Sequence, residues 1–178
     1  ANNLGTVTAG SIAGGSITCA TTFPAGHIIQ INSSSGYAYQ VLDTDIDVVM
    51  EVTLSNVKAS SHVYISWQIP FLINTDSTAV EGAEVYIFRD ASSQSVGASV
   101  NGTNIVAANP SSTEAVGWLF KSDADIEMYA TESGSIIDES ALTGTNVYKL
   151  CASAYSVTGP IVCGHDGLVS ITAMEIAR

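Results

Sequence analysis

Cationic side chains are scarce in this sequence. Its 178 residues include 5 lysines and arginines against 17 aspartates and glutamates, giving a formal net charge of −12. Binding to nucleic-acid phosphates or to an anionic membrane requires clustered cations. Here Lys58, Arg89, Lys121, Lys149 and Arg178 are scattered singly along the chain. The sequence therefore argues against a nucleic-acid partner and against a membrane partner.

Long hydrophobic runs and helical periodicity are also missing. No apolar run approaches the roughly 20 residues that a membrane-spanning helix needs. Hydrophobic residues still make up 46% of the chain, which is enough for a packed core and excludes general disorder. Charged residues make up only 12%, so much of the surface must consist of Ser, Thr, Asn and Gly.

Cysteine occurs three times, which leaves one residue without a partner in any intramolecular pairing. Cys151 and Cys163 flank a Gly159-Pro160 turn and could face each other across a hairpin. Three copies of Cys19 could meet at the axis of a trimer. We favour a third interpretation, in which all three are free thiols that pack as small hydrophobic side chains. An oxidising compartment is then not required.

Catalytic motifs are absent from the sequence. It contains no Gly-x-Ser-x-Gly elbow, no His-Glu-x-x-His pair and no phosphate-binding glycine loop. His165 and Asp166 lie close to Cys163, but this stretch is typical of a turn before the last strand. Such near neighbours in sequence rarely align as nucleophile and base. We expect a non-enzymatic protein with no cofactor.

Residues 27–178 are predicted to form one all-β domain. β-Branched and aromatic residues alternate with small polar ones between turn clusters. The predicted strands are His27–Asn32, Tyr37–Leu42, Ile46–Leu54, His62–Ile73, Ala83–Arg89, Ser95–Val100, Thr113–Lys121, Asp125–Ala130, Asn146–Tyr155, Ile161–Cys163 and Leu168–Ile176. Their spacing indicates an antiparallel, jelly-roll-like β-sandwich. Pro70 cannot donate to a ladder, so its strand should be at an edge, bulged or broken there.

Residues 1–26 form a separate repetitive segment. Gly5-Thr-Val-Thr-Ala, Gly10-Ser-Ile-Ala-Gly and Gly15-Ser-Ile-Thr-Cys repeat one five-residue pattern. A repeat with one sizeable apolar side chain per unit needs neighbours to bury it. We expect this segment to wind copies of the chain together or to anchor them on a partner, through Val7, Ile12, Ile17, Cys19 and Phe23. The alternative is a flexible linker.

Two acidic strings resemble metal ligands. Asp43, Asp45 and Asp47 would point to one side of a strand, and residues 123–127 repeat the spacing. Calcium prefers several such oxygens close together. The spacing does not match an EF-hand loop, so we interpret both strings as solvated strand faces without a metal. Calcium at the first string remains the alternative.

Aromatic residues are the candidate ligand contacts. Trp67 and Trp118 lie within apolar runs and are expected in the core. Tyr37, Tyr39, Tyr129 and Tyr155 are freer to contact a glycan or a protein, because an aromatic face offers flat apolar area with a polar rim.

Three stretches carry a family resemblance. Thr22-Phe-Pro-Ala-Gly-His-Ile-Ile-Gln-Ile31, Val85-Tyr-Ile-Phe-Arg-Asp90 and Ser170-Ile-Thr-Ala-Met-Glu-Ile-Ala177 resemble the opening, an internal strand and the closing strand of a β module of tailed-bacteriophage virion proteins. That module is of the tail-fibre, head-fibre or capsid-decoration type. The resemblance implies a virion location, a homotrimer and no enzymatic activity.

These observations lead to two expected functions. The first is a homotrimeric capsid-decorating protein, a cement protein or short head fibre on the virion surface, assembled in the host cytoplasm. Its N-terminal segment would bind the major capsid protein or another virion protein. The second is a tail-fibre tip or adhesin that binds a host-surface glycan or protein. A secreted or enzymatic sandwich is a third class, which the missing catalytic set disfavours.

Overall fold

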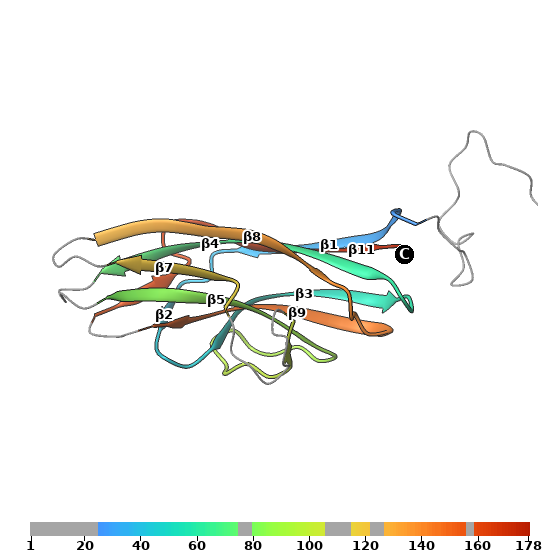
Figure 1. The fold of residues 1–178 in the computed structure, drawn as a ribbon. Coiled ribbons are helices and arrows are strands. Elements are labelled where there is room, and N and C mark those ends of the chain that lie inside the picture. Colours follow the sequence, from blue (N-terminus) through green and yellow to red (C-terminus); the bar gives the residue numbers. More distant parts are fainter. Residues whose placement is uncertain (1–24, 75–79, 106–114, 122–126, 156–158) are drawn as a thin grey trace, which may run out of the picture.

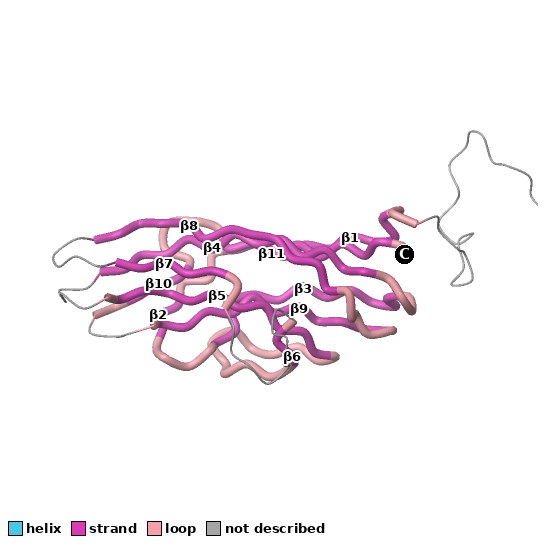
Figure 2. Tube along the Cα trace, viewed as in Figure 1, coloured by secondary structure: helices cyan, strands magenta, loops and turns pink. Residues whose placement is uncertain are grey.

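The computed structural model describes residues 25–74, 80–105, 115–121, 127–155 and 159–178. Within these ranges the regular elements are all strands (Figures 1 and 2). The predicted anchor residues Val7, Ile12, Ile17, Cys19 and Phe23 lie outside the described ranges, as does most of the segment 1–26. The predictions for that segment therefore remain predictions.

The strands form two antiparallel sheets that pack face to face (Figure 1), which confirms the β-sandwich. In sheet A, β4 pairs along one side with β8. Along its other side it pairs first with β11, which pairs with the edge strand β1, and then with β10, which pairs with β2. Sheet B has the order β3-β9-β5-β6, with β7 also paired to β5. The strands are β1 (Ile28–Gly36), β2 (Gln40–Leu42), β3 (Asp47–Val57), β4 (His62–Asn74), β5 (Glu81–Asp90), β6 (Thr103–Asn104), β7 (Gly117–Lys121), β8 (Glu127–Asp138), β9 (Gly144–Ala154), β10 (Ile161–Cys163) and β11 (Val169–Ile176).

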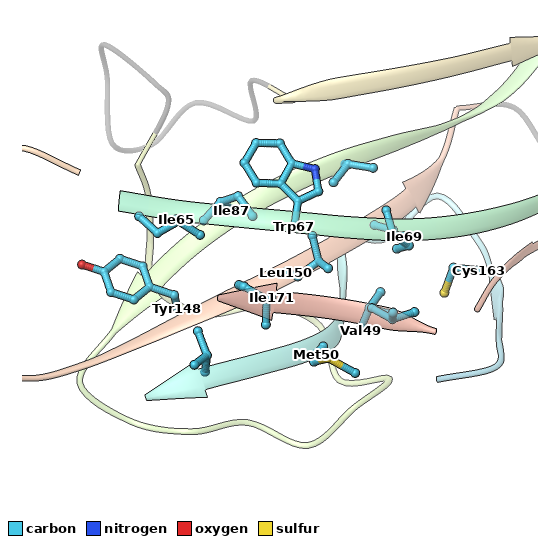
Figure 3. Close-up of a cluster of buried hydrophobic side chains, with 14 of the residues drawn as sticks. Val49, Met50, Ile65, Trp67, Ile69, Ile87, Tyr148, Leu150, Cys163 and Ile171 are labelled. Carbon is cyan, nitrogen blue, oxygen red and sulfur yellow. The ribbon is translucent and has the colours of Figure 1, made fainter. Parts of the chain in front are cut away.

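The main core lies between the two sheets (Figure 3). Ile65, Trp67 and Ile69 point inward from β4 and meet Ile87 of β5 and Leu150 of β9. The strict alternation of buried and half-buried positions along β11 follows from the period of two of a β-strand. The period-two pattern in the sequence therefore predicts which face of such a strand is buried.

The outer face of sheet B carries a second, smaller cluster. Tyr86, Phe88 and Cys151 are buried there with Val48 and Ala115. The segment after β5 is held over this face by Lys149, which is completely buried. The Lys149 Nζ donates to Gln94 Oε1 at 2.6 Å and to the Asn101 carbonyl at 2.9 Å. β9 is therefore covered on both sides.

Of the three alternatives predicted for the strand at Pro70, an edge, a bulge or a break, the structure shows a break in the pairing on one side. β4 is a central strand, paired with β8 throughout. On its other side, pairing with β11 ends at Gln68 and pairing with β10 begins at Phe71. Pro70 lies in that gap, where its carbonyl accepts a hydrogen bond from the Gly164 N–H at 2.8 Å. The missing N–H of Pro70 faces this gap, because the N–H and C=O of one residue in an antiparallel strand point the same way.

Cys151 and Cys163 are free and buried, so the hairpin disulfide is excluded. The two residues lie in different sheets, because the chain crosses from sheet B to sheet A between β9 and β10. Burial raises the pKa of the Cys163 thiol to about 12. Both thiols pack as small hydrophobic groups, as expected; Cys19 lies outside the described residues.

Two predicted strands differ most from the structure, several others differ in their bounds, and the two-residue strand β6 was not predicted. The predicted strand Asp125–Ala130 continues to Asp138, because the alternation along β8 goes on through small polar residues. The predicted strand Ser95–Val100 instead belongs to residues 91–102, the segment between β5 and β6 that covers the outer face of sheet B. It has one isolated bridge, between Ser99 and Asp47. Its backbone is held to β3, where the Gly97 N–H donates to the Val48 carbonyl at 2.8 Å.

One edge of the sandwich is closed by side chains. The edge strands β1 and β3 lie beside each other. The Gln30 Nε2 donates to the Ser55 carbonyl at 2.9 Å, and the Asn32 Nδ2 donates to the Thr53 carbonyl at 2.8 Å. These amides from sheet A occupy backbone acceptors on the outer edge of sheet B.

The two ends of the sandwich differ. At one end, which we call the proximal end, the Gly26 N–H donates to the Ala177 carbonyl at 2.8 Å. The first described residues and the C-terminus therefore lie side by side there (Figure 1). At the opposite, distal end, β4 finishes and β8 begins.

Candidate functional site

The loop between β10 and β11, residues 164–168, folds over the outer face of sheet A towards the distal end. Gly164 has a φ of 70°, and a Cβ atom there would lie 2.4 Å from the Ala38 carbonyl oxygen. A Cβ atom at Gly167 would lie 2.9 Å from the Pro70 Cγ. Glycine is needed at Gly164 for both reasons, the positive φ and the close approach of backbone. The loop is therefore seated directly on β4.

A hollow of about 360 Å³ lies beside this loop. Its lining residues are Gln68, Pro70, Phe71, Tyr129, Ala130, Thr131, His165, Asp166 and Gly167. The ring centroid of His165 is 5.7 Å from that of Tyr129 and 6.1 Å from that of Tyr39. The volume is at the lower end of the range for small-molecule sites. We call this feature the distal hollow.

The polar groups around the distal hollow are carboxylate, amide, hydroxyl and imidazole groups. The Asp166 carboxylate is largely exposed and lies 3.2 Å from the His165 Nδ1. The Tyr129 hydroxyl donates to the Glu127 Oε2 at 3.1 Å, and this bond raises the pKa of the Tyr129 phenol. Neither lysine nor arginine is among the lining residues. The hollow is therefore suited to a neutral, hydroxyl-rich group and not to an anion.

Cys163 does not supply a nucleophile to this hollow. Its side chain lies in the core between the sheets, whereas His165 lines the outer face. The Cys163 Sγ donates to the Ala38 carbonyl at 3.8 Å, and burial keeps the thiol protonated at neutral pH. What the arrangement offers is binding: aromatic faces for stacking, with an amide, a hydroxyl and a carboxylate at the rim.

Of the four tyrosines predicted to contact ligands, two lie at or near the distal hollow and two lie elsewhere on the surface. Tyr129 lines the distal hollow, and Tyr39 packs near it against His165. Tyr155 contacts the Phe120 ring at a centroid distance of 5.3 Å. Tyr37 is 81% exposed. The prediction that these tyrosines are at the surface is confirmed, while their contact with a ligand remains a prediction.

Trp67 is in the core as predicted, but the prediction for Trp118 is wrong. Trp118 is 54% exposed, because it lies on the outward side of the edge strand β7. Phe120, two residues along, shares that side and covers Gly82, where a Cβ atom would lie 2.6 Å from the Phe120 Cδ1. The alternation around the half-buried Leu119 was the signal that could have identified these exposed aromatic residues.

The first acidic string does not lie on one strand face. Asp43 and Asp45 belong to the β2–β3 connection, where the Asp45 N–H donates to the Asp43 Oδ1 at 2.8 Å. Only Asp47 lies in a strand, and its pKa is raised by burial and then by the two neighbouring carboxylates. The described residues contain no group of three or more His, Cys, Asp or Glu side chains that could hold a metal ion. In the second string, residues 123 and 125 lie outside the described ranges.

The chain was compared with family models and with curated proteins. No family model matches it, and no curated protein matches it either. The described part of the chain contains no helix that is long and apolar enough to cross a membrane. The case for function therefore depends on the residues themselves.

Proposed function

We propose that this protein is a non-enzymatic structural protein of a tailed-phage virion surface, a homotrimer that decorates the capsid as a cement protein or short head fibre. One observation carries the proposal: Gly26 is hydrogen-bonded to Ala177 at the proximal end, whereas the residues that line the distal hollow lie towards the opposite end, where β4 finishes and β8 begins. A segment that precedes Gly26 can bind a shell while the distal end points outward. The major capsid protein is the proposed partner, and the jelly-roll-like topology is part of this proposal.

Composition supports the same proposal. A net charge of −12 with few cations suits a protein displayed at high density, because like-charged copies stay soluble and avoid nonspecific contact with nucleic acid.

The three stretches that resemble the virion β module include Arg89 and Glu175, both buried. In the fold, residues 28–31 of the first stretch lie in β1, which pairs with β11, the strand that contains most of the last stretch.

The anchoring role predicts that deletion of residues 1–20 abolishes attachment to the capsid. Bound copies per particle, measured by quantitative mass spectrometry on particles incubated with the purified protein, should fall from hundreds to background. Replacing Val7, Ile12 and Ile17 by serine is the matched control for length, and it should give the same loss. Unchanged occupancy with either variant would contradict the anchor. A few copies confined to the tail would contradict decoration.

A second candidate function is a tail-fibre tip or adhesin that binds a host-surface glycan. The distal hollow favours it, because tyrosine rings with hydroxyl, amide and carboxylate groups around them suit a sugar ring. The absence of lysine and arginine among the lining residues favours a neutral sugar over an anionic one.

For this second function, Tyr129→Ala should weaken binding to a neutral glycan by tenfold or more, which corresponds to about 1.4 kcal/mol. A screen of neutral and sialylated glycans with the wild-type protein would supply the ligand, and calorimetry would give its Kd. Tyr37→Ala is the matched control, because Tyr37 is also exposed but does not line the hollow. Equal losses in the two variants, or binding only to sialylated glycans, would refute the role of the hollow.

A further inference from the structure

The outer face of sheet A is organised into rows that run across four strands. The register of β1, β11, β4 and β8 aligns their outward side chains, because directly paired residues point to the same face. From the proximal end the rows are Ile31–Met174–Tyr64–Ile137, Ser33–Thr172–Ser66–Ser135 and Ser35–Ser170–Gln68–Ser133. We call these three rows the uncharged face.

The name reflects the side chains in the three rows. None of them is ionisable at neutral pH, although the whole chain carries a net charge of −12. Among the acidic residues next to these rows, Asp138 and Glu175 are buried and Glu132 is half-buried. The first row also exposes apolar area at both ends, where Ile31 is 59% and Ile137 is 50% exposed. On so acidic a chain, this face is one where two copies can meet without bringing carboxylates together.

We propose that the uncharged face is where copies of this chain pack against one another around the three-fold axis of the homotrimer. This inference rests on the proposed homotrimer. Two copies of an acidic chain repel each other, so they associate at least cost where neither presents a carboxylate. The serine and threonine rows are also complementary to themselves, because a hydroxyl both donates and accepts hydrogen bonds.

The position of β1 points to the same arrangement. β1 is part of sheet A and starts at the proximal end with Ile28, which is 56% exposed. If the uncharged faces of three copies face the axis, the three β1 strands start close to it. The segments 1–26 would then leave the sandwiches near one another, as the predicted winding of Val7, Ile12 and Ile17 requires. The distal hollow, which shares Gln68 with the third row, would lie at the far border of the interface.

Inserting a charge into the uncharged face tests this interface. Ser66→Glu and Ser135→Glu place a carboxylate in the middle row, and each is expected to raise the concentration at which the trimer dissociates by about 100-fold or more. Ser135→Lys makes the whole chain less acidic, yet it should also dissociate the trimer, because three like charges still meet. Ser55→Glu is the matched control, since Ser55 is an exposed strand residue of sheet B.

The measurement is the mass in solution of the full chain across a dilution series, with circular dichroism to confirm that each variant is folded. A wild-type mass of three times 18.4 kDa, retained by Ser55→Glu and lost by the folded face variants, would support the interface. Folded face variants that remain trimeric would overturn the interface and leave the trimer standing. A wild-type chain that is monomeric throughout would overturn both.

Discussion

Asp138→Ala is expected to lower the free energy of unfolding by about 3–5 kcal/mol, because it leaves a buried guanidinium without its counter-charge. Asp138 ends β8 in sheet A, and its carboxylate pairs with the Arg89 guanidinium of β5 in sheet B. Both side chains are almost fully buried. The pair therefore links the two sheets across the core near the proximal end.

The surroundings of Asp138 explain why the loss should be large. The Tyr148 hydroxyl donates to the Asp138 Oδ2 at 3.0 Å, and the Ser140 N–H donates to the Oδ1 at 3.0 Å. Burial raises the pKa of the Tyr148 phenol far above its usual range, with a further contribution from the Asp138 charge. Removing the carboxylate would strand these donors together with Arg89, and each unsatisfied buried group adds to the cost.

Equilibrium unfolding in urea would measure this effect. Asp138→Asn keeps the shape of the side chain and part of its hydrogen bonding. The free energy of unfolding that this variant loses therefore measures the contribution of the Asp138 charge. The double variant Arg89→Met with Asp138→Leu should recover most of the stability, because apolar replacements of a whole buried pair are often neutral. A loss below about 1 kcal/mol for Asp138→Ala would show that the pair does not hold the sheets together.

Trp67→Ala should cost a similar amount, about 3–5 kcal/mol, because it leaves a large cavity in the main core. Trp67 is 6% exposed and lies in the middle of β4. Its directly paired residue on β8 is Gly134, and a Cβ atom there would lie 2.5 Å from the Trp67 Cζ2. The indole therefore occupies the space that a side chain at residue 134 would need.

The contact between Trp67 and Gly134 predicts that substitutions at these two residues are energetically coupled. Gly134→Val alone should destabilise by about 1–3 kcal/mol through overpacking. In the Trp67→Ala background the same substitution should cost less, because the valine methyl groups enter the vacated space. A double-mutant cycle by urea unfolding measures the coupling, which should exceed about 0.5 kcal/mol for residues in contact. If the losses of the two single variants simply add up in the double variant, the Trp67 indole is not the reason why residue 134 must be a glycine.

Local pattern was enough to predict much of the fold. The strand Ile161–Cys163 and nearly all of β4 and β5 follow from short-range alternation and turn residues. The second half of β8 was missed, because its serines, threonine and glycine resemble a loop when read without the neighbouring strand. Its strand character comes from pairing with β4, which is a long-range contact.

The candidate site was less predictable for the same reason. Tyr39 and Tyr129 were recognised as surface aromatics, but their meeting around His165 depends on three strands that pair with β4 or with one another. Trp118 appeared to belong to the core because hydrophobicity does not reveal which strand is at an edge. For Pro70 an edge, a bulge and a break all stayed open, because one sequence does not show that β10 and β11 share one side of β4.

The amide side chains along β1 have a consequence for crowding. An uncovered strand edge is a template on which another chain can add a strand, and this is a common route to aggregation. Gln30 and Asn32 already occupy the Ser55 and Thr53 carbonyls at the β3 edge. A second copy of the chain therefore finds these two backbone acceptors already occupied. We expect these two hydrogen bonds to disfavour the addition of a foreign strand at this part of the β3 edge.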